Sequence, residues 1–233
     1  MHILFIALDA PNAATQRQAI VNAGHIVTSS QADEACEAVA AYTFDAVVLA
    51  SAGADPAAAL LVRALKTSQR RTPLVLVVEK PSPGEVAQLL GHGADDVVLR
   101  ARGAAVVLAH LVALVRSAHG HARARIVIDE ALEVDLGTSQ CRFAGQTVHL
   151  TPMEYRLIEA LALRRDLPVP RSRLLELIYG AENEAFPKSI DRTVYNIRNK
   201  FSGLTRKRYL HTRAKAVMLS GGQPQMADPA PAA

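Results

Sequence analysis

Short apolar runs alternate with segments of helical period throughout residues 1–117. The runs cover residues 3–8, 25–28, 46–49, 74–78 and 97–99, and the helical patterns cover residues 12–23, 32–41, 56–68, 84–92 and 103–117. Apolar runs of this length are typical of strands buried on both faces of a parallel sheet. Their strict alternation with helices predicts a doubly wound α/β fold with five parallel strands. In such a sheet binding sites form at the carboxyl ends of the strands, so any catalytic or ligand-binding residues are expected there.

The pattern changes after residue 125. Short alternating segments at 126–128, 132–135, 140–143 and 147–150 predict a small antiparallel sheet. Thr151-Pro152-Met153-Glu154 has the sequence of a capping box with proline at the first helical position, which predicts the start of a helix. We expect a second helix over residues 172–179, a third over 188–201, and then a final pair of strands.

Charge is distributed unevenly between the two halves. Residues 1–117 carry 9 Lys and Arg against 10 Asp and Glu, whereas residues 118–233 carry 17 against 12. This excess of cations favours an anionic polymer as the partner of the C-terminal half. The sequence has no run of 18 apolar residues and no signal-peptide pattern, so we expect a soluble, cytoplasmic protein with no membrane partner. Cys36 and Cys141 fall in different halves and are expected to be reduced thiols.

Residues 188–201 form an amphipathic pattern with two unlike faces. Ile190, Val194, Ile197 and Phe201 recur at helical spacing and predict a buried stripe. At about 100° per residue, four polar side chains lie within roughly 60° of the opposite side. These are Arg192, Tyr195, Asn196 and Asn199. Amides and a planar guanidinium can read base edges in a major groove, although a basic face that is merely solvated would have the same composition.

The N-terminal half resembles the receiver domain of bacterial response regulators, through Thr72-Pro73 before one apolar run and Gly93-Ala94-Asp95-Asp96 before the next. The resemblance implies a pocket at the strand ends that holds Mg²⁺ on acidic residues and contains a phosphorylated Asp, a Ser or Thr, and a Lys-Pro pair. The corresponding positions here are Asp9, Ala50, Val78 and Arg100.

Ala50 changes the chemistry expected of that pocket. Its side chain has no nucleophilic oxygen, so no acyl phosphate can form on it. A single carboxylate, that of Asp9, is also a poor cage for Mg²⁺, which prefers several oxygen ligands. Ser51 and Asp55 are close in sequence but out of register, and substitution by either is the minor alternative. We therefore expect a pseudo-receiver that aspartyl phosphorylation does not switch.

Residues 126–219 resemble the winged-helix effector domain of the OmpR/PhoB family of response regulators, and in particular the CtrA-like effector domains. The resemblance rests on the segments 148–155, 177–180 and 188–200. It implies a winged helix-turn-helix domain with an N-terminal antiparallel sheet, whose third helix enters the major groove of DNA. The DNA-binding residues that it implies are Ser189, Arg192, Thr193, Tyr195, Asn196, Arg198, Asn199, Lys200, Arg213 and Lys215.

The final hairpin, or wing, departs from the family pattern. Ala214 and Ala216 stand where relatives have glycines, and Val217 stands where they have tyrosine. Alanine tolerates left-handed turn conformations poorly, so we expect this hairpin to turn differently. Arg213 and Lys215 still place cations near the turn, and these can attract phosphates.

A degenerate receiver can still hold two subunits together. In relatives the fourth helix, fifth strand and fifth helix pair across the dimer, and here aliphatic residues replace several of the charged ones. The dimer face implied in this way consists of Val86, Leu90, Asp95, Asp96, Val106 and His110. Core packing of Leu90 is an equal alternative. The expected organisation is a receiver-like dimerisation domain over 1–117, a linker over 118–125, a DNA-binding domain over 126–220 and a disordered tail over 221–233.

Together these features predict a sequence-specific transcription regulator that binds double-stranded DNA as a homodimer without phosphorylation. The alternative is an antagonist that pairs with a genuine response regulator. The loop 181–187 occupies the position that contacts RNA polymerase in relatives, and a cell-cycle or flagellar regulon follows only by analogy. The eight histidines show no catalytic spacing, so we do not expect an enzyme. No cofactor or metal is expected either, and His119 and His121 are interpreted as solvated linker residues.

Overall fold

The computed structural model describes residues 1–8, 13–53, 56–181 and 187–224. Contacts divide the chain into two compact units, one of Met1–Ala124 with Ser172–Ala185 and one of Arg125–Arg171 with Phe186–Ala233. We call them unit 1 and unit 2. This grouping departs from the expected domains in one stretch, because most of α7 (Arg171–Tyr179) belongs to unit 1. There Oε2 of Glu176 accepts a hydrogen bond of 2.9 Å from the backbone N–H of Thr43.

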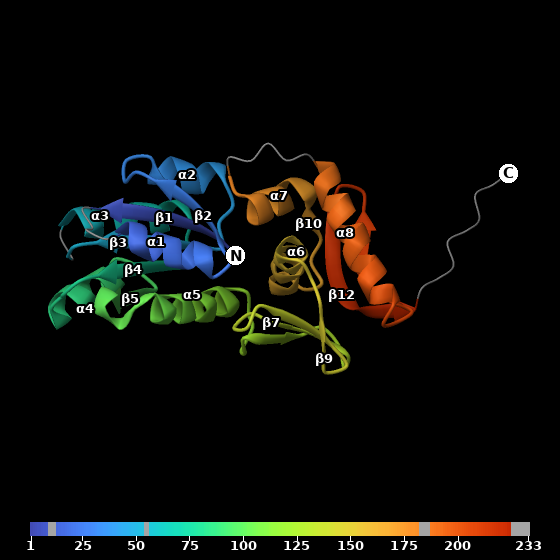
Figure 1. Cartoon of the computed structure of the whole chain (residues 1–233). Coiled ribbons are helices and arrows are strands. Elements are labelled where there is room, and N and C mark those ends of the chain that lie inside the picture. The colour runs from blue at the N-terminus through green and yellow to red at the C-terminus, as the bar shows by residue number, and fades with distance from the viewer. Residues whose placement is uncertain (9–12, 54–55, 182–186, 225–233) are drawn as a thin grey trace. The chain divides into compact units, whose positions relative to one another are not determined.

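Five parallel strands form the centre of unit 1 (Figure 1). They are β1 (His2–Leu8), β2 (Ile26–Ser30), β3 (Ala46–Ser51), β4 (Leu74–Val78) and β5 (Asp96–Leu99), in the spatial order β2-β1-β3-β4-β5. The order confirms the doubly wound sheet. It places the ends of β3, β4 and β5 beside one another, with Ala50 paired to Val77 and Val78 paired to Leu99.

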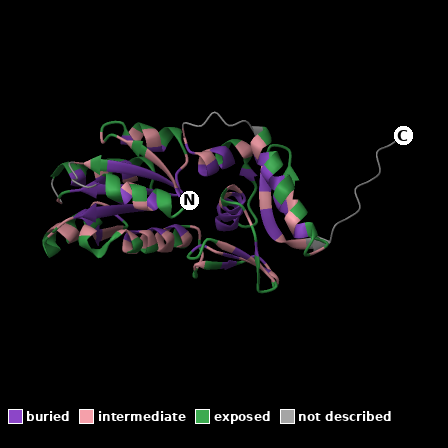
Figure 2. Cartoon of the chain, in the orientation of Figure 1, coloured by how far each residue is buried: buried purple, intermediate pink, exposed green. Residues whose placement is uncertain are grey.

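Helices cover both faces of this sheet because alternate strand residues point to opposite sides and both sets are apolar. The helices are α1 (Ala13–Asn22), α2 (Ala35–Ala41), α3 (Pro56–Ser68), α4 (Pro83–Gly91) and α5 (Ala104–Ala118). Leu4 and Ile6 of β1 share a core with Val39, Val62 and Leu89 from α2, α3 and α4. Strands β1, β3 and β4 are correspondingly the most continuously buried part of unit 1 (Figure 2). Helix α5 ends one residue inside the expected linker.

Unit 2 begins with an antiparallel sheet in the order β6-β7-β8-β9. Its strands are β6 (Arg125–Val127), β7 (Leu132–Asp135), β8 (Gln140–Phe143) and β9 (Gln146–Val148). Helix α6 (Pro152–Leu163) follows, and the capping box is present as expected. The backbone N–H of Glu154 donates to Oγ1 of Thr151 at 3.3 Å, while that of Thr151 donates to Oε2 of Glu154 at 2.7 Å. Both bonds satisfy N–H groups that a helix start leaves free.

A second sheet of unit 2 has the order β10-β12-β11. It consists of β10 (Val169–Pro170), which the sequence pattern did not suggest, β11 (Lys207–Arg213) and β12 (Ala216–Pro224). Helix α8 (Pro187–Ser202) packs against α6 and β11. Strand β12 continues to Pro224, so the first four residues of the expected tail are strand. The rest of that tail and residues 182–186 of the loop expected to contact RNA polymerase lie outside the described residues.

Candidate nucleic-acid interface

Helix α8 has the two faces that its sequence predicted. Ile190, Val194, Ile197 and Phe201 are all buried. Arg192, Tyr195, Asn196 and Asn199 are all exposed on the other side. Tyr195 is 63% exposed, which is unusual for an aromatic residue and indicates a contact surface. The exposed face offers a guanidinium, a phenol and two amides, a set that can donate and accept hydrogen bonds along a groove floor.

Thr193 departs from the expected phosphate-facing set. It is only 8% exposed, and its Oγ1 donates a hydrogen bond of 2.9 Å to the carbonyl oxygen of Ser189 one turn earlier. Threonine hydroxyls in helices commonly bond backwards in this way. The expectation was therefore wrong for the Thr193 side chain, which is turned into the helix, while Ser189 is half-buried at the edge of the face.

Arg198 and Lys200 also have internal partners. Nε and Nη2 of Arg198 donate to the carbonyl oxygen of Leu210 at 3.2 and 2.9 Å. Nζ of Lys200 lies 2.6 Å from Oε2 of Glu154 and 2.9 Å from the carbonyl oxygen of His149. These two cations join α8 to β11 and to the start of α6. Both side chains are half-buried, so these internal contacts fix their position, and their expected phosphate contacts stay a prediction.

The wing turns in two residues, Ala214 and Lys215, because Arg213 pairs directly with Ala216. Ala214 adopts a left-handed conformation with φ of 43°. Alanine is therefore accommodated in a left-handed conformation, and the turn carries the strain that alanine has there. Arg213 and Lys215 are both exposed, so the turn presents two cations to solvent.

Arg171 is a residue that the sequence reasoning missed. Its Nε and Nη2 donate to Oδ1 of Asp191 in the first turns of α8, and its Nη1 donates to the carbonyl oxygen of Ala214 in the wing. Asp191 is an acid in an otherwise cationic helix, and this could have indicated the contact. A carboxylate near a duplex is unfavourable unless it has an internal partner.

The strand ends of unit 1 hold the guanidinium of Arg100. Ala50 is fully buried at the end of β3, and Val78 is fully buried at the end of β4. Nη1 of Arg100 lies 2.5 Å from Oε1 of Glu79, and its Nη2 donates to the carbonyl oxygen of Ser51 at 3.3 Å. The Arg100 side chain is only 13% exposed. One guanidinium thus bridges the ends of β3 and β4 from the end of β5, while Asp9 and Asp55 lie outside the described residues.

Sequence comparisons agree with this geometry. Residues 145–216 match the family described as "Transcriptional regulatory protein, C terminal". Over 181 residues the chain is 28% identical to the cell cycle response regulator CtrA of Brucella ovis and 27% identical to that of Brucella anthropi, and each alignment covers 78% of both proteins. Residues 145–216 thus carry the C-terminal domain of a transcriptional regulatory protein, and the chain as a whole is similar to CtrA response regulators. Among solved structures, the OmpR/PhoB homologue DrrB of Thermotoga maritima aligns with 95% of this chain and 100% of its own, with 19% identity and a TM-score of 0.41.

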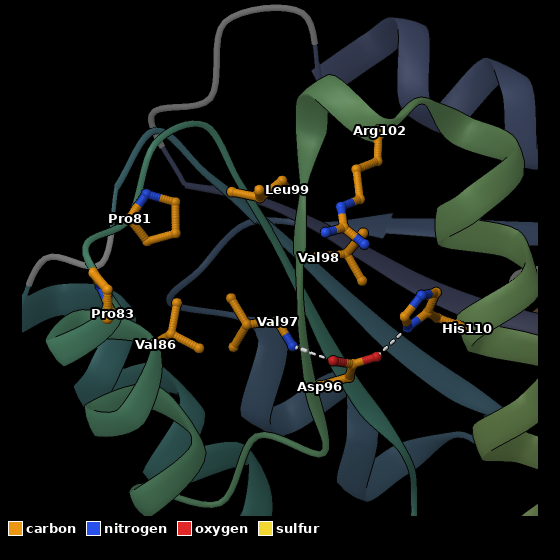
Figure 3. Close-up of a pocket in the computed structure, with 9 residues that line it drawn as sticks. All are labelled: Pro81, Pro83, Val86, Asp96, Val97, Val98, Leu99, Arg102 and His110. Carbon is orange, nitrogen blue, oxygen red and sulfur yellow. Dashed lines mark hydrogen bonds and ion pairs between the residues drawn. The ribbon is translucent and has the colours of Figure 1, made fainter.

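The expected dimer face of unit 1 contains a pocket of about 380 Å³. Pro81, Pro83, Val86, Asp96, Val97, Val98, Leu99, Arg102 and His110 line it. Figure 3 shows His110 of α5 and Asp96 of β5 pointing toward each other, and Nδ1 of His110 is hydrogen-bonded to Oδ2 of Asp96. The pocket therefore has a polar end beside walls of proline, valine and leucine.

The other three residues of the expected dimer face differ from one another in exposure and in their contacts. Leu90 is 42% exposed, whereas its neighbour Leu89 is in the core, so the alternative that Leu90 is a core residue was wrong. Asp95 is bonded internally, since its Oδ2 lies 2.9 Å from Nζ of Lys66 and accepts a hydrogen bond from the backbone N–H of Leu74. Val106 is half-buried. The expected dimer face thus combines partly exposed aliphatic residues with the internally bonded Asp95.

Within the described ranges, no group of three or more His, Cys, Asp or Glu side chains is arranged to hold a metal ion. In the same part of the chain, none of the helices combines the length and the apolar character needed to cross a bilayer.

Proposed function

We propose that this DNA-binding response regulator is a sequence-specific transcription regulator that acts in the cytoplasm as a dimer and needs no aspartyl phosphorylation. The observation that carries the proposal is the exposed face of α8, where Arg192, Tyr195, Asn196 and Asn199 have no acid among them. A helix that kept only a packing role would not need such a face, whereas one that reads base edges would.

Two residues on this face are suited to particular bases. The amide of Asn196 can make a bidentate contact with adenine, and the guanidinium of Arg192 can do so with guanine. Each such pair contributes about 1–3 kcal/mol of discrimination against the wrong base. Tyr195 adds apolar surface for a thymine methyl group, which supports a preferred sequence that differs from one read by a basic residue at this position.

The strand ends of unit 1 support independence from phosphorylation. Ala50 cannot form an acyl phosphate, and the guanidinium of Arg100 already supplies a positive charge to the ends of β3 and β4. Incubation of the full chain with acetyl phosphate and Mg²⁺ should leave its intact mass unchanged. A gain of one phosphate would contradict this part of the proposal.

The dimer is proposed to form through the face that contains Val86, Leu90 and the Asp96–His110 pair. Exposed aliphatic residues around a pocket favour burial against a second subunit. Sedimentation equilibrium of the full chain at micromolar concentration should give a dimer. Leu90→Glu should shift it toward monomer, whereas a wild-type monomer at tens of micromolar would contradict dimerisation through this face.

The deciding experiment is selection of genomic fragments by the full-length protein without a phosphodonor. We expect one motif with two half-sites, lost in the Arg192→Ala/Asn196→Ala variant and retained in Arg70→Ala, which removes an exposed cation of unit 1. Salt-sensitive binding without a motif, unchanged in the double variant, would exclude sequence reading and favour an antagonist that pairs with another response regulator. The CtrA relatives suggest promoters of cell-cycle genes as the first fragments to inspect.

A further inference from the structure

Arg171 is bonded to both parts of unit 2 that would meet DNA. Its Nε and Nη2 lie 2.9 and 2.7 Å from Oδ1 of Asp191, on α8. Its Nη1 lies 2.8 Å from the carbonyl oxygen of Ala214. Its backbone N–H donates to the carbonyl oxygen of Lys215 at 2.9 Å. A single residue therefore holds the recognition helix and both residues of the wing turn.

The chemistry of the guanidinium suits this task. Its donors point in fixed directions in one plane, so it can hold a carboxylate with one edge and a carbonyl with another. The Arg171 side chain is only 15% exposed, which reduces competition from water for both contacts. Lysine has the same charge but a single nitrogen on a flexible stem, and it cannot span the two partners in the same way.

The wing turn depends on such support. Ala214 has φ of 43°, a conformation that alanine disfavours, and its carbonyl oxygen is the one that Nη1 of Arg171 binds. Arg213 and Lys215, the two cations on either side of Ala214, are exposed, and within the described residues their side chains make no hydrogen bond or ion pair. Their position relative to α8 is therefore set through the backbone of the turn.

We propose that Arg171 is a positioning residue for DNA binding, which fixes the wing cations at the distance from α8 that lets both engage one duplex. Arg171 does not itself contact DNA in this proposal, which rests on the proposed function. Two surfaces held in a fixed relation bind together at less entropic cost than two that must be ordered on binding. Loss of the clamp should therefore remove the contribution of the wing while leaving the reading of bases by α8.

The test is a double-mutant cycle on the motif recovered in the selection, with dissociation constants measured over a range of salt concentrations. The variants are Arg171→Lys, Arg213→Ala/Lys215→Ala, and the combination. Arg171→Lys should weaken binding about tenfold, the size expected for one lost network contact. Arg171→Lys keeps the positive charge at residue 171, so a change in salt dependence cannot come from that charge. If the wing cations no longer engage the duplex, the slope of log Kd against log salt should fall toward that of the wing variant, a loss of about two phosphate contacts. The combined variant should bind no worse than the wing variant.

Asn196→Ala is the matched control, since its effect should add to that of Arg171→Lys. A structural role that only reduced the folded fraction would weaken binding without changing the salt slope. An unchanged slope, or effects of Arg171 and the wing that add, would overturn the proposal. If the wild type itself binds no duplex, the proposed function fails and this inference with it.

Asp191→Asn provides a second variant in case Arg171→Lys does not fold. Removal of an acid beside a duplex should tighten binding if electrostatics alone acts. The proposal instead expects weaker binding and a lower salt slope, because the bond from Arg171 to α8 is lost. Tighter binding by Asp191→Asn with an unchanged slope would overturn it.

Discussion

Nζ of Lys200 lies 2.6 Å from Oε2 of Glu154, and the same oxygen accepts the hydrogen bond that caps the start of α6. Glu154 is buried, so its carboxylate depends on these partners for charge and hydrogen bonding. Burial opposes its ionisation, yet the hydrogen bonds from Lys200 and Thr151 hold the pKa of Glu154 below its ordinary value. Helices α8 and α6 are thus joined through one carboxylate oxygen.

Lys200→Met should lower the free energy of unfolding of unit 2 by about 1–2 kcal/mol, since it leaves a buried carboxylate without its main donor. Lys188→Met, which removes an exposed lysine from the same helix, should change it by no more than about 0.5 kcal/mol. Urea unfolding followed by circular dichroism measures both. Equal effects of the two variants would show that the Glu154 contact contributes nothing specific.

Ala214→Gly should stabilise unit 2 by about 0.5–1 kcal/mol. Glycine removes the strain of the left-handed conformation, which costs about 1–2 kcal/mol, and loses part of that gain to its greater freedom in the unfolded chain. Ala216→Gly lies in the paired strand beside the turn and should destabilise. Thermal unfolding of the two variants should therefore give changes of opposite sign, and a loss of stability in Ala214→Gly would refute the strained turn.

Gly222→Ala should destabilise unit 2 by about 1–3 kcal/mol, as overpacking typically does. A Cβ at this position would lie 2.8 Å from Cβ of Lys207 and from Cζ of Tyr209. Gly221→Ala is the matched control, because its Cβ would meet the carbonyl oxygen of Ile128 at 3.7 Å, an ordinary contact. A melting temperature of Gly222→Ala equal to that of Gly221→Ala would contradict the close approach.

The two cysteines should differ in reactivity. Burial raises the pKa of the Cys141 thiol to about 12, with Glu133 adding to the effect, whereas Cys36 is only half-buried. Because the thiolate is the reactive form, iodoacetamide at pH 8 should label Cys36 first. Peptide mass spectrometry should find Cys141 labelled only after denaturation. Rapid labelling of Cys141 in the native protein would place it at the surface.

Stability should fall as the pH is lowered from about 7 to about 5. Burial lowers the pKa of His2 below 6.5 even though its hydrogen bond to the carbonyl oxygen of Thr43 opposes the change. Below pH 6.5 the unfolded histidine binds a proton that the folded one excludes, so the unfolded state is favoured. His2→Gln should flatten this dependence in urea titrations. The flattening should be partial, because burial also lowers the pKa of His211.

The features predicted correctly were those encoded locally. The strands of unit 1 were found because residues buried on both faces leave uninterrupted apolar runs, and the start of α6 because Thr151 and Glu154 are three residues apart. The buried stripe of α8 follows from helical spacing alone. These patterns need no knowledge of what packs against them.

The errors in the candidate site have a common physical cause. Spacing gives the direction of a Cβ atom but not the partner that a long side chain reaches, so the internal bonds of Arg198 and Lys200 were not predicted. Thr193 bonds back into its own helix, a choice that spacing does not reveal. Arg171 finds partners 20 and 43 residues further along the chain, which only the folded wing brings within reach.

The guanidinium of Arg100 has a consequence for timing. A phosphorylated carboxylate can be formed and hydrolysed, so its charge changes with time. An arginine keeps its proton at every physiological pH. On the proposed function, the charge at the strand ends of unit 1 therefore does not change in response to a signal. We expect each molecule to act from the moment it has folded until it is degraded, so that the duration of a response equals the lifetime of the protein.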